Sequence, residues 1–159
     1  MTGIIYGSTM GNTENAAKMI AEKLGDAELV SVTEMDGSIF EKYDRILFGC
    51  STWGVGDLQD DWESGIDTIK NVDFSGKQIG FFGCGDQEMY PDSFVDALGT
   101  LYEAVKDTAG EIVGKCSVDG YEFSASTAVI DGEFVGLPLD EDNQSEMTSK
   151  RITAWVAGL

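Results

Sequence analysis

The chain has 159 residues, 42% of them hydrophobic, which is enough for one domain with a full hydrophobic core. Its 29 acidic and 10 basic residues give a formal charge of −19, which excludes nucleic acid and anionic membranes as partners. The charge favours partner proteins with basic faces, and solubility alone is the alternative explanation. Because the chain contains no histidine, Ser–His catalysis, Cys–His catalysis and imidazole metal sites are excluded as well.

Three widely spaced cysteines, Cys50, Cys84 and Cys116, form no C-x-x-C pair. This pattern predicts neither a disulfide framework nor a thiolate zinc site, and it indicates a reducing compartment. The first residues enter a strand pattern without a basic leader, and no apolar run approaches the roughly 20 residues of a membrane span. We therefore expect a cytoplasmic monomer without a metal site.

Short apolar runs alternate with helical patterns along the chain. The runs predict strands at residues 3–7, 27–32, 44–50, 77–83 and 111–118. Apolar residues at helical spacing predict four helices. Their stripes are Thr13, Ala17, Ile20 and Leu24; Leu58, Trp62, Ile66 and Ile69; Phe94, Leu98, Leu101 and Val105; and Ile152, Trp155 and Leu159. Gly25 is placed to end the first helix, and Pro91 suits the first position of the third.

This alternation predicts an α/β fold, a doubly wound five-stranded parallel sheet in the order 2-1-3-4-5 with helices on both faces. Ligands of such sheets bind at the carboxyl ends of the strands. Residues 119–138 interrupt this alternation of strands and helices. They predict short β segments with turns at Asp119-Gly120 and Asp131-Gly132. We interpret them as an insertion between the fifth strand and the last helix, within a single domain of residues 1–159.

The loop after the first predicted strand, "YGSTMGNTE", suits an anionic group. It precedes a helix, whose dipole and free N–H groups attract anions, and Gly11 permits close approach. Ser8, Thr9 and Thr13 add hydroxyl groups and Asn12 adds an amide. The loop lacks the lysine that a nucleoside triphosphate requires, so it favours a terminal monophosphate. A turn that only caps the helix is the alternative.

Two further loops reach the same edge of the predicted sheet, "CSTWGVGDLQDDWE" after the third strand and "GCGDQEMYPD" after the fourth. Trp53 lies outside the helical stripe that contains Trp62, in a glycine-rich turn, and Tyr90 lies in the second of these loops. Aromatic residues in both loops, beside a phosphate site, predict a flat ring held between Trp53 and Tyr90. The ligand indicated is an aromatic mononucleotide.

These three loops, together with the tail "GEFVGLPLDEDNQSEMTSKRITAWV", resemble the flavodoxins over essentially the whole length of the chain. The inserted stretch resembles that of the long-chain group, in which it is thought to help contact partners. The resemblance implies a flavodoxin-like fold, noncovalently bound flavin mononucleotide (FMN), and no catalytic residues. It also implies a low-potential carrier that shuttles single electrons between redox proteins.

The resemblance also implies roles for individual residues. Those that would wrap the phosphate are Ser8, Thr9, Met10, Gly11, Asn12 and Thr13. Those that would meet the ribityl chain and the pyrimidine edge are Ser51, Thr52, Cys84, Gly85 and Asp86. Trp53 and Tyr90 would flank the isoalloxazine ring. The Gly54 carbonyl would accept a hydrogen bond from the flavin N5–H, and the Val55 N–H would donate to N5 of the oxidised ring. Gly56 follows, and with glycine on both sides of Val55 the loop would be softer than in many relatives.

Acidic residues follow the expected ring contacts, and we expect them to form a docking rim for basic-faced partners. They are Asp57, Asp60, Asp61, Glu63, Asp86, Glu88 and Asp92. One carboxylate at ~8 Å and an effective dielectric of ~20 costs an anionic reduced ring about 2 kcal/mol. That cost lowers a one-electron potential by roughly 90 mV.

Two alternatives stay open from the sequence. An FMN-dependent quinone or azo reductase on the same fold would need a substrate pocket over the ring, which Trp53 and Tyr90 are expected to cover. A phosphoacceptor receiver domain has the same strand order. Receivers need an acidic pair after the first strand and an aspartate at the end of the third, where this chain has Gly7-Ser8 and Cys50-Ser51.

Overall fold

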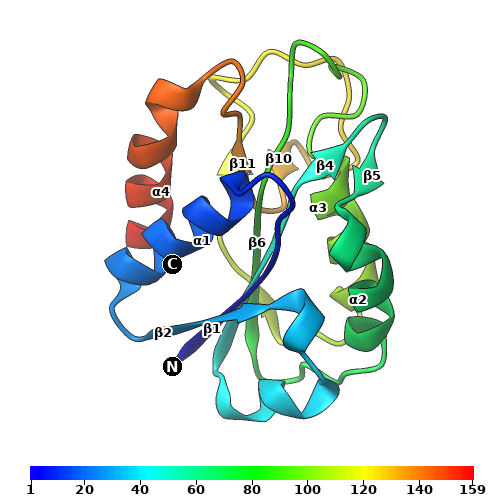
Figure 1. Cartoon of the computed structure of the whole chain (residues 1–159), viewed down its shortest axis with the longest axis vertical. Coiled ribbons are helices and arrows are strands. Elements are labelled where there is room, and N and C mark those ends of the chain that lie inside the picture. Colours follow the sequence, from blue (N-terminus) through cyan, green and yellow to red (C-terminus); the bar gives the residue numbers. More distant parts are fainter.

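A parallel sheet divides the molecule into layers in the computed structural model, which describes residues 1–159 (Figure 1). Its strands are β1 (Thr2–Gly7), β2 (Ala27–Ser31), β3 (Arg45–Cys50), β6 (Gln78–Cys84), β7 (Glu111–Ile112) and β11 (Leu137–Leu139). The order is β11-β6-β3-β1-β2, and β7 also pairs with β6. All these pairings are parallel, which confirms the predicted doubly wound sheet.

Two helices cover each face of the sheet. In Figure 1, α1 (Asn12–Leu24) and α4 (Thr148–Ala157) lie side by side on one face, and α2 (Asp60–Lys70) and α3 (Asp96–Val105) lie on the other. Three short 3-10 helices, Val32–Glu34, Gly37–Lys42 and Ser145–Met147, complete the helical segments.

Alternating strand residues build the two halves of the core. Ile5 and Phe48 belong to a cluster with Trp62 of α2, whereas Ile4 and Leu47 belong to a second cluster with Ile152 of α4. All of these side chains are 0% exposed, because a strand covered by helices on both faces buries its residues of either parity. This double burial explains why the strands are continuous apolar runs in the sequence.

The first helix begins and ends as predicted. Thr13, Ala17 and Ile20 are buried on one face of α1. Gly25 ends the helix with a φ of 79°, and its N–H donates to the Ala21 carbonyl at 3.0 Å. A glycine is favoured here because other residues rarely adopt this left-handed conformation.

The third helix begins later than predicted, at Asp96 and not at Pro91. Val95 has a φ of 47°, which no helix accommodates, so the chain turns sharply before α3. The Pro91 carbonyl instead accepts hydrogen bonds from the amides of Ser124 and Ala125, at 2.7 and 3.0 Å. The assignment of Pro91 was therefore wrong, because its loop is fixed by a distant segment.

The fifth predicted strand is split. Of residues 111–118, only those of β7 pair with β6, and Gly114, with a φ of 76°, turns the chain out of the sheet. The chain then forms a separate sheet, β8-β10-β9, from β8 (Cys116–Ser117), β9 (Val129–Ile130) and β10 (Glu133–Phe134). It returns as β11, which pairs with Phe82–Cys84 of β6. The excursion thus lies inside the fifth strand, and not between that strand and the last helix.

The predicted turn at Asp131-Gly132 is confirmed as the link between β9 and β10. Both residues have positive φ angles, 53° and 83°, as a two-residue hairpin requires. A Cβ at Gly132 would meet nothing within 4 Å, so only backbone strain opposes a side chain there.

We expect Gly132→Ala to lower the free energy of unfolding by about 1–2 kcal/mol, the cost of a left-handed alanine. Urea unfolding monitored by circular dichroism measures this change. Gly37→Ala is the matched control, because Gly37 has no positive φ and a Cβ added there would make only an ordinary contact at 3.5 Å. Equal losses in the two variants would contradict the backbone argument.

No helix of the structure combines the length and the apolar character needed to cross a bilayer.

Candidate functional site

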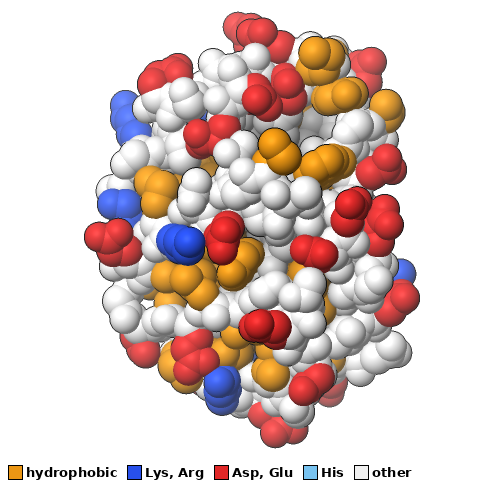
Figure 2. All heavy atoms as spheres, viewed as in Figure 1, with side chains coloured by type: hydrophobic (Ala, Val, Ile, Leu, Met, Phe, Trp, Pro, Cys, Tyr) orange, Lys and Arg blue, Asp and Glu red, His pale blue; other side chains and the backbone are white.

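The loops after β1, β3, β6 and β11 enclose a cleft of about 290 Å³ at the carboxyl edge of the sheet. Its lining residues are Ser8, Met10, Asn12, Ser51, Thr52, Trp53, Gly54, Cys84, Gly85, Asp86, Tyr90, Glu141 and Asp142. In Figure 2, hydrophobic side chains surround a hollow at the upper right, at the end of the sheet where β4 (Thr52–Trp53) and β5 (Asp57–Leu58) lie in Figure 1. Loops far apart in the sequence thus meet at one place.

Most of the predicted site residues line this cleft. The exceptions are Thr9, Gly11, Thr13, Val55 and Gly56, which belong to the same loops but do not line the cavity. Glu141 and Asp142 line it and were missed.

The first loop presents unpaired backbone donors. The Gly11 N–H donates to Ser8 Oγ at 3.1 Å, and the Asn15 N–H makes the first helical hydrogen bond, to the Gly11 carbonyl at 2.9 Å. No side chain caps α1, and no protein group accepts from the amides of Asn12, Thr13 and Glu14. The helix therefore presents three free donors and the positive end of its dipole to any anion at the loop.

Two buried side chains hold the first loop to the second. Thr13 Oγ1 lies 2.5 Å from Ser51 Oγ, and Thr13 is fully buried, so it supports the cleft from beneath. Gln59 Nε2 donates to Thr9 Oγ1 at 2.9 Å, which leaves the hydroxyl proton of Thr9 free to be donated elsewhere. No sequence pattern pointed to Gln59, because a polar residue before a helix is usually exposed; here it is only 1% exposed.

The second loop is a hairpin of β4 (Thr52–Trp53) and β5 (Asp57–Leu58), in which Trp53 stands opposite Asp57. Gly54 and Gly56 both have positive φ angles, 51° and 90°, in the connection between the strands. Trp53 is 37% exposed, although a tryptophan ordinarily packs into a core. The hairpin thus presents an aromatic ring to the cleft.

The third loop is braced by its own carboxylate. Asp86 Oδ1 accepts hydrogen bonds from the Met89 amide at 2.9 Å and from Asn143 Nδ2 at 2.7 Å. The Tyr90 amide donates to the Asp86 carbonyl at 3.0 Å, and the Tyr90 ring is 38% exposed. Asp86 therefore fixes the loop that carries the second aromatic ring of the cleft.

A fourth loop, after β11, was missed. Asp140 is fully buried and accepts hydrogen bonds from the Gln87 amide at 3.1 Å and from Gln87 Nε2 at 2.8 Å. This carboxylate ties the fourth loop to the third and leaves Glu141 and Asp142 facing the cleft. Burial, and then the neighbouring carboxylates, raise the pKa of Asp142.

The cleft has carboxylates but no lysine or arginine in its lining. Any anionic group bound here must therefore be held by neutral donors, as the first loop supplies them. Hydrogen bonds from neutral donors to a charged group contribute roughly 1.5–3 kcal/mol each, so several of them suffice.

The cysteines are protected by burial. Cys84 lines the cleft but is only 7% exposed, and burial raises its pKa to about 12. Burial likewise raises the pKa of Cys50 and that of Cys116 to about 12. Burial therefore disfavours the thiolate, which is the nucleophilic form, at all three positions.

We expect iodoacetamide to react with the folded protein at pH 8 about a thousandfold more slowly than with the chain in guanidinium, because thiolate is the reacting form. Unfolded thiols ionise near pH 9 and the folded ones near pH 12. The stabilisation from burying neutral thiols is therefore complete below about pH 9 and is lost as the pH rises through about 12. Mass spectrometry of the alkylated protein measures the rates, and fast labelling of Cys84 in the folded state would contradict this explanation.

Known proteins resemble the chain over nearly its whole length. The family model described as Flavodoxin matches residues 4–155. A flavodoxin of Picosynechococcus sp. is 46% identical over 160 residues, covering 99% of this chain and 94% of that protein. Flavodoxin 1 of Escherichia coli is 43% identical, covering 98% of this chain and 90% of that protein. The crystal structure of Fusobacterium nucleatum flavodoxin bound to flavin mononucleotide has a TM-score of 0.92 at 30% identity, covering 98% of this chain and 94% of that one.

Proposed function

The chain belongs to the flavodoxin family, and on that basis we propose that it is an electron carrier that binds FMN in the cleft. It shuttles single electrons between redox proteins and is not an enzyme. The observation that carries the assignment is a single cleft that combines an uncapped helix N-terminus with two half-exposed aromatic rings.

The first loop fits a phosphate monoester. The amides of Asn12, Thr13 and Glu14 lack protein acceptors, and the hydroxyls of Ser8 and Thr9 lie on the same loop. Neutral donors hold the dianion here without adding a cation to the site. Gln59 donates a hydrogen bond to the Thr9 hydroxyl and so orients that hydroxyl for donation to the phosphate.

The second and third loops fit a flat aromatic ring. Trp53 and Tyr90 flank the isoalloxazine ring, while Ser51, Thr52 and the backbone of residues 84–86 contact the ribityl chain and the pyrimidine edge. When bound, FMN supplies a ring that takes up and releases electrons one at a time. In this proposal, the Gly54 carbonyl and the Val55 N–H would exchange as partners of the ring nitrogen N5.

The rim of the cleft is acidic, and its charge suits basic-faced partner proteins. Glu141 and Asp142 join Asp86 in the lining, and none of the three forms an ion pair with a protein cation. A negative rim speeds the approach of positively charged partners and raises the cost of adding negative charge to the ring, which lowers its potential. The carrier acts as a cytoplasmic monomer and meets one partner at a time. The family and its relatives give no support to a quinone or azo reductase.

The experiment that tests this function is the visible spectrum of the protein, followed anaerobically through stepwise reduction. We expect a yellow protein that is reduced in two separate one-electron steps. Reduction in one two-electron step would overturn the carrier in favour of the reductase. A spectrum without flavin, even after FMN is added, would overturn the cofactor assignment.

A further inference from the structure

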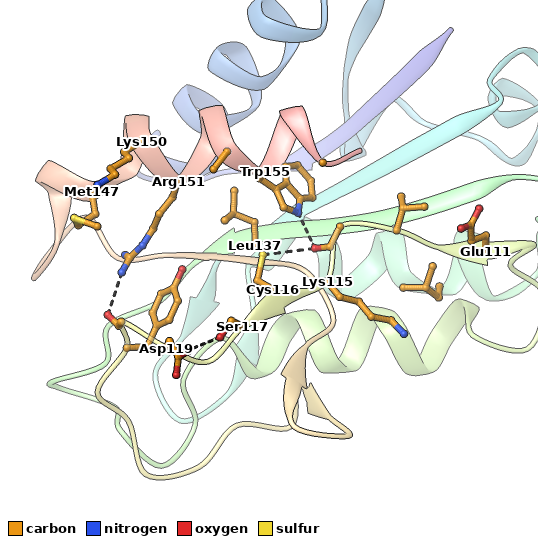
Figure 3. A pocket seen from close by; sticks show the side chains of 17 residues that line it. Glu111, Lys115, Cys116, Ser117, Asp119, Leu137, Met147, Lys150, Arg151 and Trp155 are labelled. Carbon is orange, nitrogen blue, oxygen red and sulfur yellow. Dashed lines mark hydrogen bonds between the residues drawn. The ribbon is translucent and has the colours of Figure 1, made fainter.

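A second, larger cavity lies away from the FMN cleft. It is a groove of about 720 Å³ between α4 and the segment that leaves the sheet after β7, and it shares no lining residue with the cleft (Figure 3). The groove exists because the fifth strand is split. The chain leaves the sheet at Gly114 and returns to it at Leu137. Beside α4 there is therefore the beginning of the excursion instead of a continuous strand.

The middle of the groove is apolar and held in place by hydrogen bonds. Trp155 and Leu137 form its floor, and Cys116 lies beside them in Figure 3. Trp155 Nε1 donates to the Gly114 carbonyl at 2.7 Å, and Tyr121 OH donates to the Pro138 carbonyl at 2.7 Å. The walls are therefore formed before any ligand arrives, which lowers the entropy cost of binding.

The groove is lined by more basic than acidic residues, whereas the chain as a whole is strongly acidic. Lys115, Lys150 and Arg151 line it, three of the chain's ten basic residues, and none of them forms an ion pair. Its two carboxylates, Glu111 and Asp119, form no ion pair with these three cations. In Figure 3, Lys150, Arg151 and Asp119 lie toward one end of the groove, and Lys115 extends toward Glu111 at the other.

The Arg151 guanidinium is held firmly but is not satisfied. Its Nη2 donates to the Gly120 carbonyl at 3.1 Å and to Gln144 Oε1 at 2.6 Å, and its Cζ lies 4.1 Å from the centre of the Tyr121 ring. Its Nη1 is buried without any acceptor. An unsatisfied charged donor is costly, so the guanidinium keeps a hydrogen-bonding capacity that the chain itself does not use.

We propose that this groove is a binding site for a small amphiphilic anion, an apolar body that carries one carboxylate, sulfonate or phosphate group. The acidic group lies at the end formed by Lys150 and Arg151, and the apolar body lies along the middle of the groove beside Trp155. A neutral apolar ligand would leave the cations unpaired, and a small inorganic anion would leave most of the groove of about 720 Å³ empty. The inference does not depend on the proposed electron-transfer function, because the two cavities share no residue.

The test uses FMN-loaded protein, so that the cleft is filled, and a pair of probes that differ in charge. Anilinonaphthalene sulfonate is the amphiphilic anion, and phenylnaphthylamine is the same ring system without the sulfonate. The readout is the indole N–H signal of each of the three tryptophans in amide NMR spectra. We expect saturable movement of the Trp155 signal with the anionic probe and at least tenfold weaker binding of the neutral one. Equal binding of the two probes, or movement of the Trp53 signal alone, would overturn the proposal.

Charge reversal at one exposed residue tests the position of the acidic group. Lys150→Glu is expected to weaken binding of the anionic probe about tenfold, because it replaces an attraction at the charged end with a repulsion. Lys70→Glu is the matched control, since Lys70 ends α2, outside the groove, and makes the same change in net charge. Both lysines are exposed, so neither change is expected to disturb folding. Equal losses in the two variants would show a nonspecific effect of net charge and overturn the site.

Discussion

Replacing Trp53 with alanine is expected to weaken FMN binding about a hundredfold. Trp53 is 37% exposed in the structure, so a flavin ring stacked on it would cover indole surface that the protein leaves open. Covering that surface and pairing two rings are together worth about 3 kcal/mol, which corresponds to a hundredfold change in the dissociation constant. Titration of the apoprotein with FMN, followed by quenching of flavin fluorescence, measures the loss.

Two controls separate stacking from other effects. Trp53→Phe keeps an aromatic ring and is expected to lose no more than about tenfold in affinity. Met89→Ala removes an apolar side chain that is 68% exposed on the third loop but does not line the cleft, so it is expected to leave the affinity unchanged. If Trp53→Ala binds FMN as tightly as the unaltered protein, the ring does not lie against Trp53.

Burial on both faces made the sheet predictable from the sequence. A strand such as β3 places Leu47 in one core cluster and Phe48 in the other, so successive residues are apolar and the run stands out. The loops were predictable for a related reason. Parallel strands bring their carboxyl ends to one edge, and Trp53 and Tyr90 had no place in a helical stripe. Local pattern and topology then pointed to the same place.

Features that depend on distant segments were not predictable. Residues 111–118 were predicted as one strand, but the left-handed turn at Gly114 takes the chain out of the sheet after β7. Leu137–Leu139 is too short to be recognised as a strand, and it is stabilised by pairing with β6. Because β11 was missed, the carboxyl edge that it shares with the other loops was missed too. Glu141 and Asp142 were therefore absent from the predicted site.

Gln59 and Asp140 show the same limit at the level of side chains. Each is buried, and each bonds a loop that is far away in the sequence, Thr9 for Gln59 and Gln87 for Asp140. A polar residue in a loop or before a helix is usually solvated, and no local pattern distinguishes a buried one. Residues that line the cleft were thus easier to predict than those that hold its loops in place.

The second large effect is expected from a substitution in the hairpin that carries Trp53. Gly54 and Gly56 have positive φ angles, and the only atom within 4 Å of a Cβ added at Gly54 is Asp57 Oδ2, at 3.9 Å. There is room for a side chain at Gly54, so the restriction on this position comes from the backbone. A residue with a branched Cβ strongly disfavours positive φ and removes the freedom of the Gly54 carbonyl to turn toward the ring.

Gly54→Val is therefore expected to bring the two one-electron midpoints of bound FMN closer together, lowering the first and raising the second by roughly 60 mV or more each. A left-handed conformation costs an ordinary residue about 1–2 kcal/mol, and 59 mV corresponds to a tenfold change for one electron. Spectra recorded during anaerobic titration against redox dyes measure both midpoints.

Gly76→Val is the matched control, since Gly76 has a φ of 76°, no atom within 4 Å of an added Cβ, and a place outside the cleft. It is expected to lower stability and to leave both midpoints in place. Unchanged midpoints in Gly54→Val would show that the Gly54 carbonyl does not respond to the redox state of the ring. That result would contradict the role proposed for this turn, but not the assignment of the cleft as the FMN site.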